Sequence, residues 1–351
     1  LNNIIKINFK DDPIYLRLWK YYVYSYDKKN AVPLVLLDSD VEDNSEKIKR
    51  LTAQLYRSSD NWIKIMQRLI LGVGAIKSLD ALGCSINKYH LNEGHAAMAF
   101  IDKAKNLDKK ELANLGKVFV YTCHTPAAAG HDKFPIKDME NILPDKEISF
   151  LKGCCEYKDD SINFTTCLLT HCESINAVSK KHQCIMGAQF PQFKNKIDYI
   201  TNGIHISTWI SQSFSKLFDK YKEVIGDYRS SPDGLKKIVN LKKDEQFRID
   251  LWNAHQSNKK RLAEIFNHWR IREDVLTLCW ARRIAQYKRP SLILQNIERL
   301  LSIAKNIGQL QIIIAGKAHP ADNLVGTYID EMMNTINNLN KEFKFLRIIM
   351  L

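Results

Sequence analysis

The sequence lacks any run of the roughly 20 apolar residues that a membrane-spanning helix needs. Its first residues, Leu1 to Pro13, also lack the apolar core of a signal peptide. We therefore expect a cytoplasmic protein. The chain begins with leucine rather than methionine, and residues 345–351 read as a buried strand that stops without a terminal signal. Both ends are expected to be breaks in a longer polypeptide.

Several motifs of specialised chemistry are also missing. The eight cysteines include no CxxC pair and no framework spacing, so reduced thiols are expected. No Ser or Cys stands in a nucleophile-elbow motif, which gives covalent catalysis no support. The net charge is +13, yet no basic motif interleaved with aromatic residues occurs, so we expect an anionic ligand rather than nucleic acid.

The composition is that of an ordinary globular protein, with 45% hydrophobic and 26% charged residues. Its length suggests about two domains. In the first half, hydrophobic spacing predicts buried strands at residues 33–37 and 118–122 and helices at 62–73 and 96–104. The second strand would deliver His124 to its carboxyl end.

The second half shows a clearer alternation of strands and helices. Strands are predicted at residues 275–280, 310–315 and 345–351, and helices at 290–304 and 321–339. This alternation favours an α/β fold with a parallel sheet covered by helices. Ligands of such sheets bind beyond the carboxyl ends of the strands.

A turn at Thr201-Asn202-Gly203 suggests a domain boundary, with domains at residues 1–200 and 201–351. The most informative segment lies in the second domain, where Arg282 to Pro290 follows a predicted strand. The guanidinium groups of the arginines and the ammonium group of the lysine could share phosphate oxygens there. Proline suits the first turn of a helix, and the free N–H groups of that turn favour an anion. The alternative is a basic surface loop.

Other polar residues follow predicted strands or turns. Gly316 and Lys317 would lie on the same sheet edge as the basic segment, as a ligand loop or a simple turn. His124 is placed to bond a polar ligand or to serve as a structural cap. His90 and His95 flank Glu93 in a polar turn, but the H-x-x-E-x-H spacing fits no metalloprotease helix, and we expect no metal.

Five segments occur in the order typical of one enzyme family. They are Tyr89 to His95, Cys123 to Pro126 with Ala129 to Asp132, Ile200 to His205 with Trp209, Arg283 to Arg289, and Ala315 to Asp322. In these segments the chain resembles the α-glucan (glycogen, starch and maltodextrin) phosphorylases, in particular an internal fragment of the short bacterial and archaeal branch. Weaker similarity covers residues 36–44 and the helix through Gly72.

The resemblance implies a glycosyltransferase-B fold of two Rossmann-like domains, both incomplete here. It implies reversible, retaining phosphorolysis of terminal α-1,4-glucosidic bonds, with α-glucan and inorganic phosphate as partners and pyridoxal 5′-phosphate as cofactor. The oligomeric state stays open, with a homodimer of the whole protein as one option.

The resemblance also implies roles for individual residues. Arg283 would bind the substrate phosphate, Lys288 would hold the phosphate pair, and His124 would hydrogen-bond the reacting glucosyl unit. The remaining implied residues are Asn202, His95, Glu93 and Tyr287 for the substrate and Arg282, Gly316 and Lys317, with Lys288, for the cofactor.

The sequence departs from the family pattern at several points. The Met-Lys segment that carries the cofactor's lysine is absent, as is the family's glycine-rich phosphate loop. Ala127-Ala128 replaces Val-Pro, and Arg68 stands where Glu is usual beside Gln67. We therefore expect this polypeptide alone to be inactive and unable to hold the cofactor covalently. A glycogen or starch synthase and a non-catalytic glucan-binding remnant are the alternatives.

Overall fold

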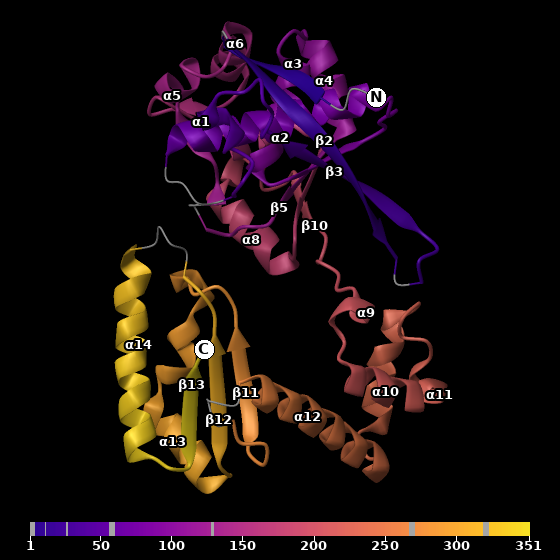
Figure 1. Cartoon of the computed structure of the whole chain (residues 1–351), viewed down its shortest axis with the longest axis vertical. Coiled ribbons are helices and arrows are strands. Elements are labelled where there is room, and N and C mark those ends of the chain that lie inside the picture. The colour runs from indigo at the N-terminus through magenta and orange to yellow at the C-terminus, as the bar shows by residue number, and fades with distance from the viewer. Residues whose placement is uncertain are drawn as a thin grey trace. The chain divides into compact units, whose positions relative to one another are not determined.

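The computed structural model describes residues 4–10, 12–25, 27–55, 60–127, 130–266, 271–318 and 323–351. The chain forms two compact units, Leu1–Gly203 (unit 1) and Ile204–Leu351 (unit 2) (Figure 1). Both combine helices with a parallel sheet, so the fold is mixed α/β. None of the described helices has the length and apolar character that crossing a bilayer would require.

Unit 1 is built around a parallel sheet of four strands in the order β10-β9-β5-β4. An antiparallel sheet of β1, β2 and β3 and a small antiparallel sheet in the order β6-β8-β7 complete its strands. The strands are β1 Ile4–Phe9, β2 Asp12–Tyr24, β3 Ala31–Asp38, β4 Tyr89–Asn92, β5 Phe119–Cys123, β6 Lys133–Pro135, β7 Tyr157–Lys158, β8 Ser161–Asn163, β9 Ser174–Ala177 and β10 Ile197–Tyr199.

Helices supply most of the remaining core of unit 1. They are α1 Glu46–Lys49, α2 Asn61–Ala81, α3 Ala97–Ala104, α4 Lys109–Val118, α5 Ile136–Glu140, α6 Asp145–Cys154, α7 Phe164–His171 and α8 Lys180–Gln189, with short 3-10 helices at Gly94–Ala96 and Pro191–Phe193. The predicted helix at 62–73 is confirmed as part of α2, which begins where the Asp60 side chain accepts the Trp62 N–H. Helix α2 passes through Gly72, where a Cβ would collide with the backbone of α3.

Two expectations for unit 1 are wrong in part. The strand predicted at 33–37 exists as β3, but Val32, Leu34 and Leu36 are exposed because β3 is the outer strand of an antiparallel sheet rather than a buried parallel strand. The polar turn predicted at 91–95 begins inside β4, whose His90 and Asn92 face away from the core. A short strand whose polar residues lie on one side is hard to distinguish from a polar turn by sequence alone.

Unit 2 carries a parallel sheet in the order β11-β12-β13, formed by Leu276–Ala281, Leu310–Ala315 and Leu346–Met350. The three predicted strands are therefore confirmed to within about one residue at most ends. The central strand β12 is buried, and Leu310, Ile312 and Ile314 pack in one cluster with residues of α13 (Ile297–Asn306) and α14 (Asn323–Glu342).

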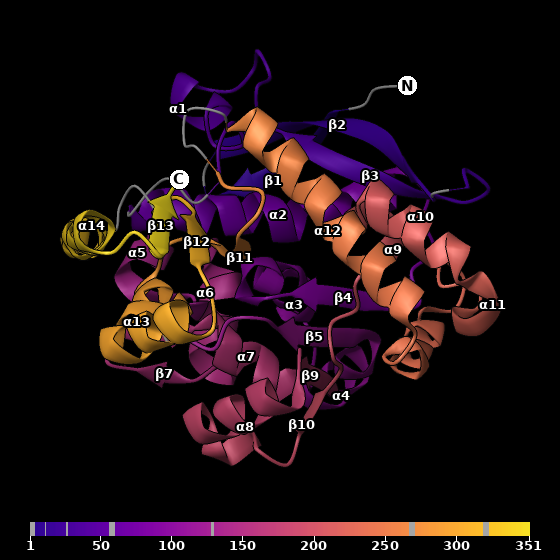
Figure 2. The ribbon, with the colours of Figure 1, turned by 90° about the horizontal axis from the view of Figure 1, so that it is seen from below.

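The helix α12 (Glu245–Ile265) links two small cores of unit 2. Its Leu262 packs beside Ile313 of the sheet, whereas its Phe247 belongs to a cluster with α10 (Gln212–Lys220) and α11 (Lys222–Ile225). Figure 2 shows α12 extending between these parts. Shorter helices are α9 Ile206–Trp209 and the 3-10 helices η4 Pro232–Leu241, η6 Gln286–Lys288 and η7 Pro290–Leu294.

The expectation of reduced thiols is wrong for one pair of cysteines. Cys155 and Cys167 form a disulfide, with their Cα atoms 4.7 Å apart. The sequence separation of 12 residues hides this proximity, because the antiparallel strands β7 and β8 turn the chain back between the two cysteines. The free cysteines are Cys84, Cys123, Cys154, Cys172, Cys184 and Cys279.

Candidate functional site

Polar residues gather beyond the carboxyl ends of the parallel strands in unit 1. Glu93 follows β4, His124 follows β5, and Asn202 lies after β10, where its N–H donates to the Val178 carbonyl at 3.2 Å. Because these strands are parallel neighbours, their carboxyl ends share one edge of the sheet. We call these three residues, with His95, Asp132 and His182 described below, the histidine edge.

Glu93 ties two of the strand ends together. Its side chain is 6% exposed, and its Oε1 accepts the backbone N–H of His124 at 2.8 Å. Its φ of 64° lies in the left-handed region, which costs energy in a residue other than glycine. Among the described groups, its Oε2 is buried without a hydrogen-bond partner. Glu93 thus offers an unused acceptor at this edge.

His182 adds a buried imidazole to this edge, and the sequence alone did not single it out. It lies on α8 at 5% exposure, and its Nδ1 accepts the Val178 N–H at 3.4 Å. Burial lowers the pKa of His182, so the ring is neutral and its hydrogen sits on Nε2. This Nε2 is buried without a partner at hydrogen-bond distance among the described residues, while the Thr125 backbone interacts with the ring and opposes the lowering of its pKa.

His95 is held by a buried ion pair. The Arg68 guanidinium donates twice to Asp132, from Nε at 2.8 Å and from Nη2 at 3.0 Å, and the His95 Nδ1 lies 2.8 Å from the same carboxylate. Burial would raise the pKa of Asp132, but the hydrogen bonds from His95 and Arg68 and their charges lower it to about 2. The Arg68 substitution noted in the sequence is therefore compensated by a charge partner.

The basic segment and the glycine-lysine segment lie side by side in unit 2. The Arg282 N–H donates to the Ala315 carbonyl and the Ile284 N–H to the Lys317 carbonyl, each at 3.0 Å. A Cβ on Gly316 would collide with the Arg282 carbonyl oxygen, so only glycine allows this approach. The structure thus brings together the two segments beyond β11 and β12, as their parallel strands predict.

These two adjoining segments carry five cations, which we call the cation edge: Arg282, Arg283, Lys288, Arg289 and Lys317. No carboxylate of the described residues forms an ion pair with any of them. The Lys288 Nζ lies 5.1 Å from the ring centroid of Tyr287, which is itself half exposed. Three of the cations, Arg282, Lys288 and Arg289, line a groove of 790 Å³ together with Pro290.

The predicted helix at 290–304 is wrong in its first part. Pro290 begins a 3-10 helix that ends at Leu294, and α13 starts only at Ile297. Arg289 precedes it with a φ of 52°, in the left-handed region. The chain turns too tightly here for a continuous α-helix, so an anion at this edge would be held by side chains rather than by a long helix dipole.

Two of the five segments lie partly outside the described residues. These are residues 128–129 in the stretch from Cys123 to Asp132 and residues 319–322 in the stretch from Ala315 to Asp322. His90 is considered from the sequence as a metal ligand, and no metal is expected there. Its Nε2 lies 2.6 Å from the Thr122 hydroxyl oxygen. The histidine edge and the cation edge belong to different units and are described separately.

Comparison with known proteins adds independent evidence. A family described as carbohydrate phosphorylase matches residues 145–351, which include all of unit 2. The glycogen phosphorylase of Aquifex aeolicus is 30% identical over 89% of this chain and 49% of its own length. The maltodextrin phosphorylase of Thermococcus litoralis is 31% identical over 91% of this chain and 41% of its own length.

This chain therefore spans half or less of these relatives. The match nevertheless runs through both units and both polar edges, in agreement with the five ordered segments of the sequence. The chain belongs to the carbohydrate phosphorylase family.

Proposed function

We propose that this chain forms part of an α-glucan phosphorylase that releases glucose 1-phosphate from the ends of α-1,4-glucans with retention of configuration. Residues 1–200 and 201–351 would be parts of the two Rossmann-like domains of a glycosyltransferase-B fold. The observation that carries the proposal is the cation edge, where two hydrogen-bonded segments carry five positive side chains that have no ion-pair partner among the described residues.

The arrangement of the cation edge suits phosphate. Like charges brought together repel one another, and a phosphate dianion would relieve that repulsion. Arg283 would present a planar fork to two phosphate oxygens, whereas Lys288 would act as a point charge between phosphate groups. Tyr287 would orient Lys288 through its ring, since the Nζ lies over it.

The donor set at this edge also fits the phosphate of pyridoxal 5′-phosphate. Arg282, Lys288 and Lys317 offer guanidinium and ammonium donors, and Gly316 leaves its backbone open to close approach. When bound, the cofactor would supply a phosphate group that relays a proton to the substrate phosphate. The role of Arg282 and Lys288 is then to hold two anionic groups in contact against their mutual repulsion.

The histidine edge suits a neutral, hydroxyl-rich ligand. A sugar hydroxyl both donates and accepts a hydrogen bond, and this edge holds a buried carboxylate oxygen, Glu93 Oε2, and a buried imidazole nitrogen, His182 Nε2. His124, fixed through its backbone by Glu93, would bond the reacting glucosyl unit. Asn202 and His95 would bind hydroxyls of the same sugar, with His95 oriented by Asp132.

The test measures glucose 1-phosphate after the complete gene product that contains these residues is mixed with maltodextrin and inorganic phosphate. We expect product without any nucleotide sugar. Product that forms only from a nucleotide sugar would instead identify a synthase. Maltodextrin binding without any turnover would identify a non-catalytic protein, and either result would overturn the proposal.

A further inference from the structure

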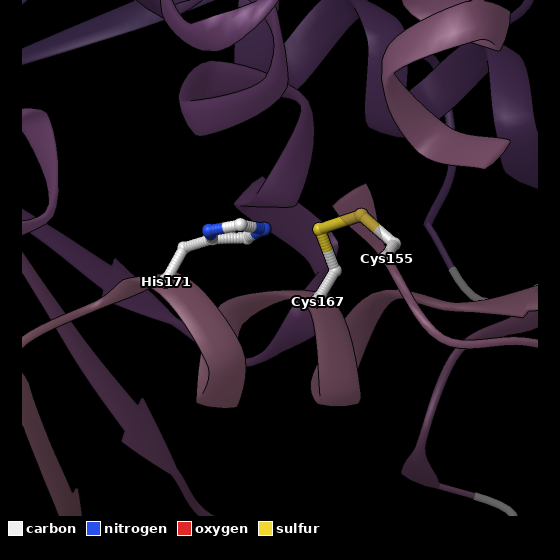
Figure 3. Close-up of side chains that lie close together, drawn as sticks. All are labelled: Cys155, Cys167 and His171. Carbon is white, nitrogen blue, oxygen red and sulfur yellow. A yellow bond between two sulfur atoms is a disulfide. The ribbon is translucent and has the colours of Figure 1, made fainter. Parts of the chain in front are cut away.

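Another cluster of reactive side chains lies in unit 1 and shares no residue with either polar edge. Cys155, Cys167 and His171 each present a ligand atom, and these atoms lie within 4.8 Å of one another. Figure 3 shows the His171 ring directed toward the sulfur atoms of the two cysteines. No other group of this kind occurs among the described residues.

Local structure explains why these residues meet. Cys167 and His171 are four residues apart on α7, so they share one face of the helix. Cys155 caps the end of α6, and the β7-β8 pair returns the chain so that it faces α7. The cluster therefore depends on three elements of the fold and not on a flexible loop.

The surroundings of the cluster are apolar and ordered. Cys155 is 9% exposed and Cys167 is fully buried. The His171 ring stacks on Phe100, with ring centroids 5.4 Å apart, and lies beside Phe150 at 5.8 Å. Its Nε2 lies 2.7 Å from the Cys154 carbonyl oxygen, which fixes the ring.

We propose that, once the disulfide is reduced, Cys155, Cys167 and His171 bind one thiophilic divalent metal ion of the zinc class. Two thiolates and one imidazole form a ligand set that zinc uses, with a fourth position left for water. A divalent cation also neutralises two buried thiolates, whose isolated charges the apolar surroundings would disfavour.

The two states of the cluster exclude each other chemically. Reduction by a dithiol breaks the S–S bond with two electrons and two protons, and the dithiol closes into its own disulfide. Metal binding then forms two metal–sulfur bonds and releases the two thiol protons to water. In both states the site links the end of α6 to α7. The proposal does not depend on the proposed function.

Cobalt(II) is the probe for the test, because cobalt thiolates absorb in the near ultraviolet and visible range. The 351-residue chain is reduced with a dithiol, freed of it by gel filtration without oxygen, and titrated. We expect thiolate-to-cobalt absorption that saturates at one ion per chain and is displaced by zinc. Cys155→Ala and Cys167→Ala should abolish it, and His171→Asn should weaken binding about tenfold or more.

The matched control replaces exposed Cys84 and Cys184 with Ala, which should leave the titration unchanged. If a variant fails to fold, the proposal can still be tested by the alkylation of cysteines in the unaltered chain. Zinc should slow alkylation of Cys155 and Cys167 in the reduced protein, as mapped by peptide mass spectrometry. Absence of cobalt absorption from the unaltered chain, absorption in the two cysteine variants equal to that of the unaltered chain, or unprotected alkylation would each overturn the proposal.

Discussion

The histidine edge and the cation edge stand at equivalent places in two parallel sheets, yet their polar groups are held in opposite ways. At the histidine edge, Glu93 bonds the His124 backbone, and Asp132 is paired with Arg68 and His95. At the cation edge, no described carboxylate pairs with the five positive side chains. The first edge is therefore organised by its own contacts, whereas the second leaves its cations without a carboxylate partner among the described residues, as the proposed phosphate site requires.

If the cation edge binds the reacting phosphate, removing one of its guanidinium groups should have the largest effect on phosphorolysis. In the complete gene product, Arg283→Ala should lower kcat/KM for phosphorolysis by about 10²–10³, since a preorganised donor of developing charge is lost. Initial rates of glucose 1-phosphate formation check this. Arg299→Ala, an exposed cation on α13, is the control and should change the rate less than about twofold. Equal effects of the two substitutions would contradict the assignment.

The internal pairing of the histidine edge predicts a large loss of stability when one partner is removed. Asp132→Asn leaves Arg68 without a charge partner at only 11% side-chain exposure, which should cost about 3 kcal/mol of unfolding free energy. Urea denaturation of the chain measures it. Asp233→Asn breaks an exposed pair with Lys236, which solvent screens, and should leave the unfolding free energy nearly unchanged. A similar cost for both would show that the buried pair does not organise the edge.

The close approach of the two loops at the cation edge can be broken at one glycine. Gly316→Ala places a methyl group against the Arg282 carbonyl and should destabilise unit 2 by about 2 kcal/mol. Gly153→Ala in α6 meets no atom within 4 Å and should stabilise the chain by about 0.5 kcal/mol. Thermal unfolding of both variants compares them, and a neutral Gly316→Ala would refute the close packing.

The smallest expected effect is a dependence of stability on acid pH. The folded pKa of Asp132 is about 2, below its ordinary value of 3.8, so its ion pair contributes fully above about pH 4. That contribution, between about 1 and 2 kcal/mol, should be lost as the pH falls from about 4 through about 2. Denaturation at several pH values measures the loss of unfolding free energy. The Asp132→Asn variant, which lacks this carboxylate, should lose less unfolding free energy over the same pH range. An identical pH profile would contradict the pairing.

The sequence predicted the sheet of unit 2 well, because its strands are continuous apolar runs between turn residues. The strand at 310–315 agrees with β12 at both ends, and all of its residues before Ala315 are buried. The juxtaposition of Arg282 and Gly316 followed from the parallel order of these strands. Such features depend on local patterns and on one topological rule, and both can be read from sequence.

Features that depend on contacts between distant segments could not be predicted. His182 approaches Glu93 and His124 only because α8 packs beside β9, and Cys155 meets Cys167 through the turn of β7 and β8. Pairing with distant residues, rather than local propensity, decides each of these cases.

Binding of inorganic phosphate by the chain itself tests the central claim most directly. We would titrate the 351-residue protein with phosphate and follow the ³¹P line width by nuclear magnetic resonance, beside an Arg283→Ala/Lys288→Ala double variant. The account predicts saturable broadening with the unaltered chain and its loss in the variant. Equal broadening in the two proteins, or none in either, would contradict a phosphate site at the cation edge.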